Sequence, residues 1–164
     1  RLAASAVAPG SAAAAQLRAL WEFVRRDMSH AFAPPPEENV ASGAAVLLLA
    51  LRGRAVVGLM WAERICEAEL VQFGDCGSVG HVTDLGKKGV PASLGVVLVW
   101  VRRLDRRRGV AATMLGAARR VAVPLGAAPV PMDEVAFSQP TELGAKFAAS
   151  CVGRQTVPVY QPRW

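Results

Sequence analysis

The residues best placed to do chemistry are a run of arginines ending in a glycine, Arg106 to Gly109, near the middle of the chain. The apolar run before it, Val96 to Val101, is rich in β-branched residues and predicts a buried strand. Apolar residues then recur at helical spacing, at Val110, Met114, Ala117 and Val121. The first N–H groups of a helix have no acceptor within it, and the helix dipole adds positive charge there. The stretch therefore predicts a phosphate site.

The overall charge agrees with an anionic partner. The chain has 164 residues, a net charge of +6 and a pI near 10. Such a balance favours a phosphate-bearing cofactor, nucleic acid or an acidic protein. Ala, Gly, Val and Arg dominate throughout, so a general compositional bias explains the arginine excess equally well, and charge alone leaves the partner open.

The cysteines and histidines do not predict a metal site. Cys66, Cys76 and Cys151 are odd in number and irregularly spaced, which favours a reducing compartment. Together with His30 and His81 they lack the paired spacing of a zinc finger. No apolar run reaches the length of about 20 residues that a membrane span needs, so no membrane association is predicted.

The pattern along the chain predicts one α/β domain over residues 16–164, after an Ala-rich stretch over 1–15 that we expect to be frayed, with backward extension of the next helix through its alanines as the alternative. The chain begins at Arg1, so we expect an excised domain or fragment. The expected elements are a helix over 16–28, a hairpin of strands 44–51 and 55–63, a long and partly mobile excursion over 65–93 with a short strand at 70–73, a strand over 96–101, a helix over 110–121, a loop over 121–132, a strand over 134–138, a helix after Thr141 and a strand over 156–160. The hairpin is apolar on both faces, so we expect helices on both faces of a mixed sheet.

Several separated segments carry a family resemblance. RRRGVA at 106–111 fits the Arg/Gln-x-x-Gly-x-Gly/Ala loop of acyl-CoA-dependent N-acetyltransferases. In the same order, the chain has RAVVGLMWAE at 54–63, PASLGVVLVWV at 91–101, EVAFSQPT at 134–141 and a tail from FAASC at 147–151 to VY at 159–160. These segments resemble the establishment-of-cohesion lysine N-acetyltransferases of the GNAT superfamily, which modify the cohesin ring. The resemblance implies the GNAT fold, in which the cofactor lies where two neighbouring strands splay apart.

The resemblance also implies a site for acetyl-CoA. Its pantetheine arm would pair with the strand residues Val99, Trp100 and Val101. Its pyrophosphate would be held by Arg107, Arg108, Gly109, Val110, Ala111 and Ala112. The cofactor would be flanked on its other side by Thr141, Glu142 and Leu143. The family's zinc finger precedes this domain and has no counterpart here, so no metal is expected in this segment.

The chain departs from the family at the carboxylates. Transfer to lysine needs a base, because a lysine ammonium has a pKa of about 10.4. The family carries a Glu and an Asp at the positions of Gly116 and Gln139, neither of which can accept a proton. Glu63, Glu134 and Glu142 are the candidates to replace them.

Three functions follow as alternatives. The first is an acetyl-CoA-dependent lysine acetyltransferase acting on a cohesin SMC subunit, in the nucleus and indirectly associated with chromatin. The second is a catalytically impaired member that binds acetyl-CoA or cohesin. The third is a basic nucleic-acid-binding module using Arg102, Arg103 and Arg106 to Arg108, although the aromatic residues lie in apolar runs and do not alternate with basic residues as stacking platforms do.

Overall fold

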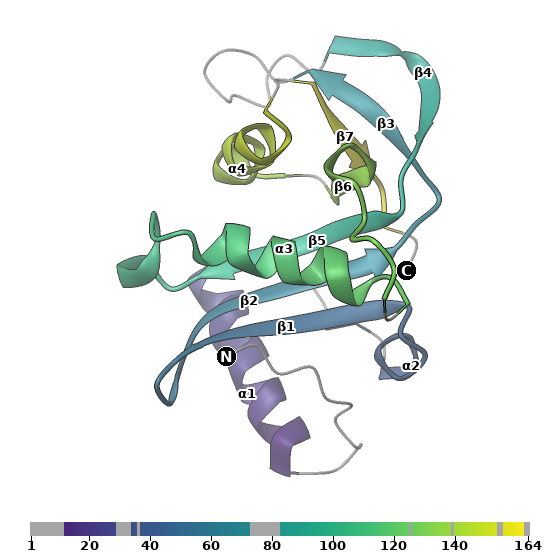
Figure 1. The fold of residues 1–164 in the computed structure, drawn as a ribbon. Helices are drawn as coiled ribbons and strands as arrows, with labels where there is room; N and C mark the ends of the chain where they lie inside the picture. The colour runs from purple at the N-terminus through teal and green to yellow at the C-terminus, as the bar shows by residue number, and fades with distance from the viewer. Residues whose placement is uncertain are drawn as a thin grey trace.

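The computed structural model describes residues 12–28, 34–35, 37–72, 83–124, 126–138, 140–153 and 156–162 (Figure 1). The helices are α1 (Ala12–Asp27), α2 (Glu37–Ala41), α3 (Val110–Val121) and α4 (Glu142–Val152), with short 3-10 turns at Arg103–Asp105 and Met132–Glu134. The strands are β1 (Ala45–Arg52), β2 (Ala55–Arg64), β3 (Glu67–Gln72), β4 (Thr83–Pro91), β5 (Leu94–Val101), β6 (Val135–Ser138) and β7 (Thr156–Tyr160).

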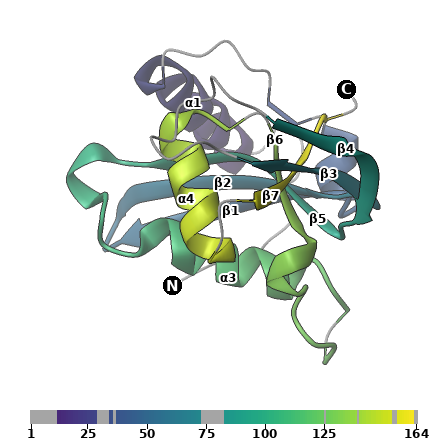
Figure 2. The ribbon, with the colours of Figure 1, turned by 90° about the horizontal axis from the view of Figure 1, so that it is seen from above.

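All these strands form one mixed sheet in the order β1-β2-β5-β6-β7-β3-β4. β5 pairs in parallel with β6, and β6 pairs in parallel with β7, while the other neighbours are antiparallel. Helices cover both faces, with α1 on one side and α3 on the other (Figure 2). The predicted α/β fold is therefore confirmed.

Each face of the sheet has its own core. On one face, α3 and α4 pack Met114, Leu115 and Ala148 against strand residues such as Leu48 and Met60. On the other face, α1 buries Trp21 and Val24 against β2 and β5, at Leu59, Trp61, Leu98 and Trp100. The indole of Trp100 donates a hydrogen bond of 2.7 Å to Asp27 at the end of α1. β2 is apolar on both faces because each face packs against helices.

Two predictions about the chain's organisation need correction. The stretch over 65–93, expected to be an excursion, contains the hairpin of β3 and β4 in its described part, and the sequence indicated only a short strand at 70–73. Its polar and glycine-rich composition hid a strand that pairs at the edge of the sheet. Residues 12–15, expected to be frayed, begin α1, because alanine is the strongest helix former. Residues 1–11 lie outside the described part.

β5 carries an irregularity where it leaves β6. Leu98 pairs with Trp61 and Val96 pairs with Ala62, so Val97 is an extra residue with no partner in β2. Such a bulge bends a strand and increases its twist. The parallel pairing of β5 with β6 ends at the same place, because the last paired residue of β5 is Val96.

Two buried glycines allow close packing against the sheet. A Cβ built on Gly95 would lie 2.6 Å from the hydroxyl oxygen of Tyr160, in direct collision with the ring. A Cβ built on Gly58 would lie 2.9 Å from the terminal methyl group of Met114. The aromatic ring of Tyr160 is rigid and buried, whereas the end of a methionine side chain moves easily.

We predict that Gly95→Ala lowers the free energy of unfolding by roughly 1–3 kcal/mol through overpacking. The matched variant Gly58→Ala costs less than Gly95→Ala, because its closest contact, at 2.9 Å, is the flexible end of Met114, and Val110 Cγ1 at 3.0 Å need move only a few tenths of an ångström. Urea denaturation of both variants measures the difference. Equal stability of Gly95→Ala and the unmodified chain would show that Tyr160 does not lie against β5.

Candidate functional site

The free edge of β5 beyond Val96 is the first part of the site. The N–H group of Arg102 donates to the Val57 carbonyl of β2 at 2.9 Å, and Trp100 pairs with Leu59. Because backbone groups alternate along a strand, those of Val99 and Val101 point away from β2, into the space that opens between β5 and β6.

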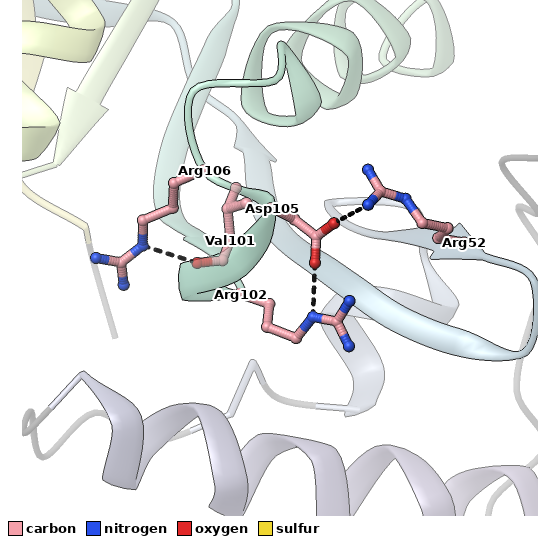
Figure 3. Close-up of polar contacts among 5 residues, drawn as sticks. All are labelled: Arg52, Val101, Arg102, Asp105 and Arg106. Atoms are coloured by element: carbon pink, nitrogen blue, oxygen red, sulfur yellow. Dashed lines mark hydrogen bonds and ion pairs between the residues drawn. The ribbon is translucent and has the colours of Figure 1, made fainter.

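Two side chains confirm the direction of this edge. Ser138 at the end of β6 donates its hydroxyl to the Val97 carbonyl at 3.0 Å, and Arg106 donates Nε to the Val101 carbonyl at 3.0 Å (Figure 3). Between these contacts, no described strand pairs with Val99 on this side. An extended, amide-bearing ligand such as a pantetheine arm can pair there as an added strand.

The second part of the site is the start of α3. Gly109, with φ of 76°, caps this helix without a side-chain hydrogen bond, and Arg107, with φ of 61°, also has left-handed backbone. Thr113 is the first residue whose N–H returns to the Gly109 carbonyl, at 2.9 Å. Within the described residues, no group accepts from the N–H of Val110, Ala111 or Ala112. These donors and the adjacent left-handed residues form a backbone concavity suited to phosphate.

The start of α4 differs from that of α3. Thr141 caps α4, accepting a hydrogen bond of 3.3 Å from the N–H of Gly144 through its side chain. Since β5 and β6 are parallel, the loops that follow them leave the same edge of the sheet, and both helix starts flank the opening. Thr141, Glu142 and Leu143 therefore lie on the opposite side of the opening from the arginine loop. Of these two helices, only α3 starts without a side-chain cap.

A buried carboxylate holds the arginine loop in place. Asp105 has 0% exposure, accepts a hydrogen bond of 2.6 Å from Nε of Arg102, and forms an ion pair of 2.5 Å with Arg52 at the end of β1 (Figure 3). The hydrogen bond from Arg102 is the largest cause that lowers the pKa of Asp105, and the charges of Arg52 and Arg108 add to it. The carboxylate ties the turn after β5 to the neighbouring hairpin.

The arginines of the loop consequently divide into two groups. Arg52 and Arg102 are engaged by Asp105, and Arg106 donates to Val101. Arg107 and Arg108 are exposed and form no ion pair with any described residue. Their charges are therefore available to an anion at the start of α3.

The three candidate carboxylates do not gather in one place. Glu142 starts α4 beside the opening, and its 2.6 Å hydrogen bond from Lys146 lowers its pKa. Glu63 pairs with Gly95, and Glu134 directly precedes β6, so both lie at the closed end of the β5–β6 pair. Glu134 accepts the hydroxyl of Ser93. It also lines a hollow of about 300 Å³ together with Leu70, Val90, Pro91 and Asp133.

Of the two positions where the family carries carboxylates, Gly116 lies within α3 and Gln139 lies outside the described residues. A Cβ built on Gly116 would meet only Arg120, at 3.9 Å. A Cβ at this position therefore makes no close contact.

Other residues bear on the alternatives. Trp21, Trp61, Trp100 and Phe137 are buried at 2–4% exposure, so none of them offers a stacking platform for bases. Among the described residues, no cluster of three His, Cys, Asp or Glu side chains could hold a metal, and His30, Cys76 and His81 lie outside them. No helix in the described ranges combines the length and apolar character needed to cross a membrane.

Sequence reasoning missed Asp105, Ser138 and Tyr160. Asp105 was detectable as the one acid within RRLDRRR at 102–108, where a carboxylate among arginines indicates an ion-pair anchor. Ser138 and Tyr160 act through contacts between strands that are distant in sequence, and no local pattern marks them.

A mixed sheet whose parallel strands part between two helix starts is the acyl-CoA N-acyltransferase (GNAT) fold. The xEco2 acetyltransferase domain has this fold, with a TM-score of 0.72 and 24% identity, covering 96% of this chain and 89% of that one. The same domain bound to a K105-CoA conjugate also gives a TM-score of 0.72, at 23% identity, with coverage of 96% and 92%.

The sequence comparisons point to a smaller group of relatives than the fold does. Residues 90–160 match the family model described as ESCO1/2 acetyl-transferase. N-acetyltransferase ECO1 of Yarrowia lipolytica is 32% identical over 126 residues, which are 77% of this chain and 42% of that protein. The chain thus spans about two fifths of this curated relative. In sequence and fold, the chain is thus similar to acetyltransferase domains of the Eco/ESCO type, as its motifs predicted.

We predict that Asp105→Asn lowers the free energy of unfolding at neutral pH, because it leaves Arg52 and Arg102 without their anionic partner. The folded-state pKa of Asp105 is depressed, so its contribution is present above the unfolded pKa of about 3.9 and is lost as pH falls through the lower folded value. Denaturation at pH 7 and pH 3 measures this. A stability difference that does not narrow at pH 3 contradicts the role of the charge.

Proposed function

We propose that this chain is an acetyl-CoA-dependent protein-lysine N-acetyltransferase that acts on a cohesin SMC subunit to establish sister-chromatid cohesion. Such an enzyme works in the nucleus, on chromosomes, and reaches chromatin through its substrate. The observation that carries the proposal is the opening beyond Val96, where the free edge of β5 leads to the uncapped start of α3.

Each part of the opening has a task in this reaction. Val101 and Val99 would supply backbone groups for the pantetheine amides, and the N–H of Val99, which is nearer the acyl end, would stabilise the oxyanion that forms on the thioester carbonyl. The N–H groups of Val110, Ala111 and Ala112 bind the pyrophosphate, with Arg107 and Arg108 adding charge. CoA as the bound cofactor is supported by the similar fold of the xEco2 acetyltransferase domain, whose structure contains a K105-CoA conjugate.

The direct test incubates the chain with acetyl-CoA and a recombinant cohesin SMC head domain, and measures acetyl-lysine by mass spectrometry. We expect product that depends on both the chain and acetyl-CoA. Transfer would be refuted if the chain binds acetyl-CoA but yields no more acetyl-lysine than a reaction that lacks the chain.

We predict that the double variant Arg107→Gln/Arg108→Gln weakens CoA binding by about 10- to 100-fold, since a charge-assisted hydrogen bond contributes roughly 1.5–3 kcal/mol. Isothermal titration calorimetry with CoA measures this. The control Arg120→Gln removes an exposed positive charge from the other end of α3 and should leave the affinity unchanged. Equal losses in both variants would mean that only the net charge matters.

The second candidate function is an impaired family member that binds acetyl-CoA or cohesin with little turnover. Gly116 favours it, because this position of α3 has room for a side chain and carries none.

If Gly116 limits catalysis, Gly116→Glu should raise the transfer rate by at least about tenfold, given that a positioned base typically contributes 10²–10⁴-fold. The size-matched Gly116→Gln variant controls for improved helix propensity. Brisk transfer by the unmodified chain, with no gain in Gly116→Glu, would eliminate this second function.

A further inference from the structure

The side chain of Tyr160 reaches from β7 across β6 to β5. Tyr160 pairs with Ser138 of β6, yet its ring lies against Gly95 of β5 and packs in one cluster with Ala136. The absence of a side chain at Gly95 and the small one at Ala136 leave room for the phenol. Three strands thus combine to place one hydroxyl group.

That hydroxyl faces Glu63. Gly95 and Glu63 are partners across β5 and β2, so the phenol reaches the carboxylate at the end of β2. Tyr160 is 7% exposed, and its hydroxyl has no regular hydrogen bond among the described residues, although the two groups lie close enough to affect each other's pKa. A buried phenol without a satisfied hydrogen bond costs free energy, so its retention requires an explanation.

Both groups belong to the same face of the sheet, at the closed end of the β5–β6 pair next to the point where the two strands part. Leu59 and Trp61 of β2 pack with α1, so Glu63, two residues further along, points to the α1 face. Tyr160 packs with Val97, the bulged residue at which β5 and β6 part. With phosphates at the start of α3 and pantetheine along Val101 and Val99, the acyl end of the substrate arrives at Val97.

We propose that Glu63 and Tyr160 form the site that receives the acceptor amine, a lysine ammonium. This inference rests on the proposed function and names the residues on the acceptor side of it. An ammonium group has three donors and no acceptor, which complements a carboxylate beside a phenol oxygen. Glu63 is only partly buried, so its carboxylate can be reached from the surface.

The residues then perform a balanced transfer. Glu63 takes one proton from the ammonium, and the amine lone pair forms the C–N bond to the thioester carbonyl carbon. The C–S bond breaks, its electron pair leaves on the sulfur of CoA, and a second amine proton neutralises that thiolate. One proton stays on the amide nitrogen, and Tyr160 orients the amine by accepting a hydrogen bond from it.

The surroundings of Glu63 suit a base. Its neighbours across the sheet are Ala45 of β1 and Gly95 of β5, so among the described residues Tyr160 is the one titratable group that faces it. Burial raises the pKa of Glu63, and the interaction with Tyr160 partly opposes that rise. A raised pKa brings a carboxylate closer to the range in which it accepts protons effectively at neutral pH.

The test compares Glu63→Gln and Tyr160→Phe with the unmodified chain, using acetyl-CoA and the cohesin SMC head domain. We expect Glu63→Gln to lower kcat by about 100-fold or more and to lose the acidic limb of the pH–rate profile. We expect Tyr160→Phe to raise KM for the acceptor by roughly tenfold, for one lost hydrogen bond to a charged group. The exposed carboxylate of Glu69 on β3 provides the control Glu69→Gln, which should change neither value.

Two further measurements separate this role from a structural one. CoA affinity should be unchanged in Glu63→Gln and Tyr160→Phe, and Glu63→Gln should melt at or above the temperature of the unmodified chain at neutral pH, because it removes a partly buried charge. Unchanged kcat and KM in both variants, or losses that follow CoA affinity or melting temperature, would overturn the inference while the proposed function stands. Absence of transfer by the unmodified chain would overturn both.

Discussion

The short parallel pairing of β5 with β6 is the constraint on which the rest of this structure depends. The two strands share only the pairs from Leu94–Val135 to Val96–Phe137, and the unpaired Val97 then bends β5 away. Because the strands are parallel, the loops after them leave one edge and deliver the starts of α3 and α4 to the two sides of the same opening. Backbone groups that a longer β6 would satisfy, those of Val99 and the N–H of Val101, remain available to a ligand. A full-length pairing would give a more regular sheet with no site.

The two ends of β5 carry opposite charge: arginines follow its carboxyl end, and a glutamate lies beside its amino end. At its carboxyl end, the buried Asp105 engages Arg52 and Arg102, so the turn keeps a fixed shape while Arg107 and Arg108 stay available to anions. At its amino end stands Glu63, facing Tyr160 on the α1 face. Gly95 and Val101, near the two ends of β5, are separated by about 20 Å of strand, at roughly 3.3 Å per residue. The proposed anion site after Val101 and the proposed amine site beside Gly95 therefore suit a substrate that carries phosphates at one end and a reacting carbonyl at the other.

Local patterns predicted the parts of the fold that depend on local physics. The β-branched run of β5, the helical spacing of α3 and the apolar hairpin of β1 and β2 were all readable, because strand, helix and hairpin each have a sequence signature. β4 escaped prediction because its pairing with β3, rather than its own composition, makes it a strand. The bulge at Val97 and the reach of Tyr160 over Gly95 depend on the register between separate strands, which a single sequence does not encode locally. The strand and the helix that carry the proposed cofactor-binding residues were therefore predictable, and the pairing that surrounds Glu63 was not.

We propose that the edge of β5 and the start of α3 together bind acetyl-CoA. Amide hydrogen exchange, measured by NMR with and without CoA, tests this binding residue by residue. We predict new protection at the N–H groups of Val99 and Val101 and at those of Val110, Ala111 and Ala112, with no comparable change along β3. Protection that appears elsewhere, or saturating CoA that leaves these amides exchanging as before, would contradict it.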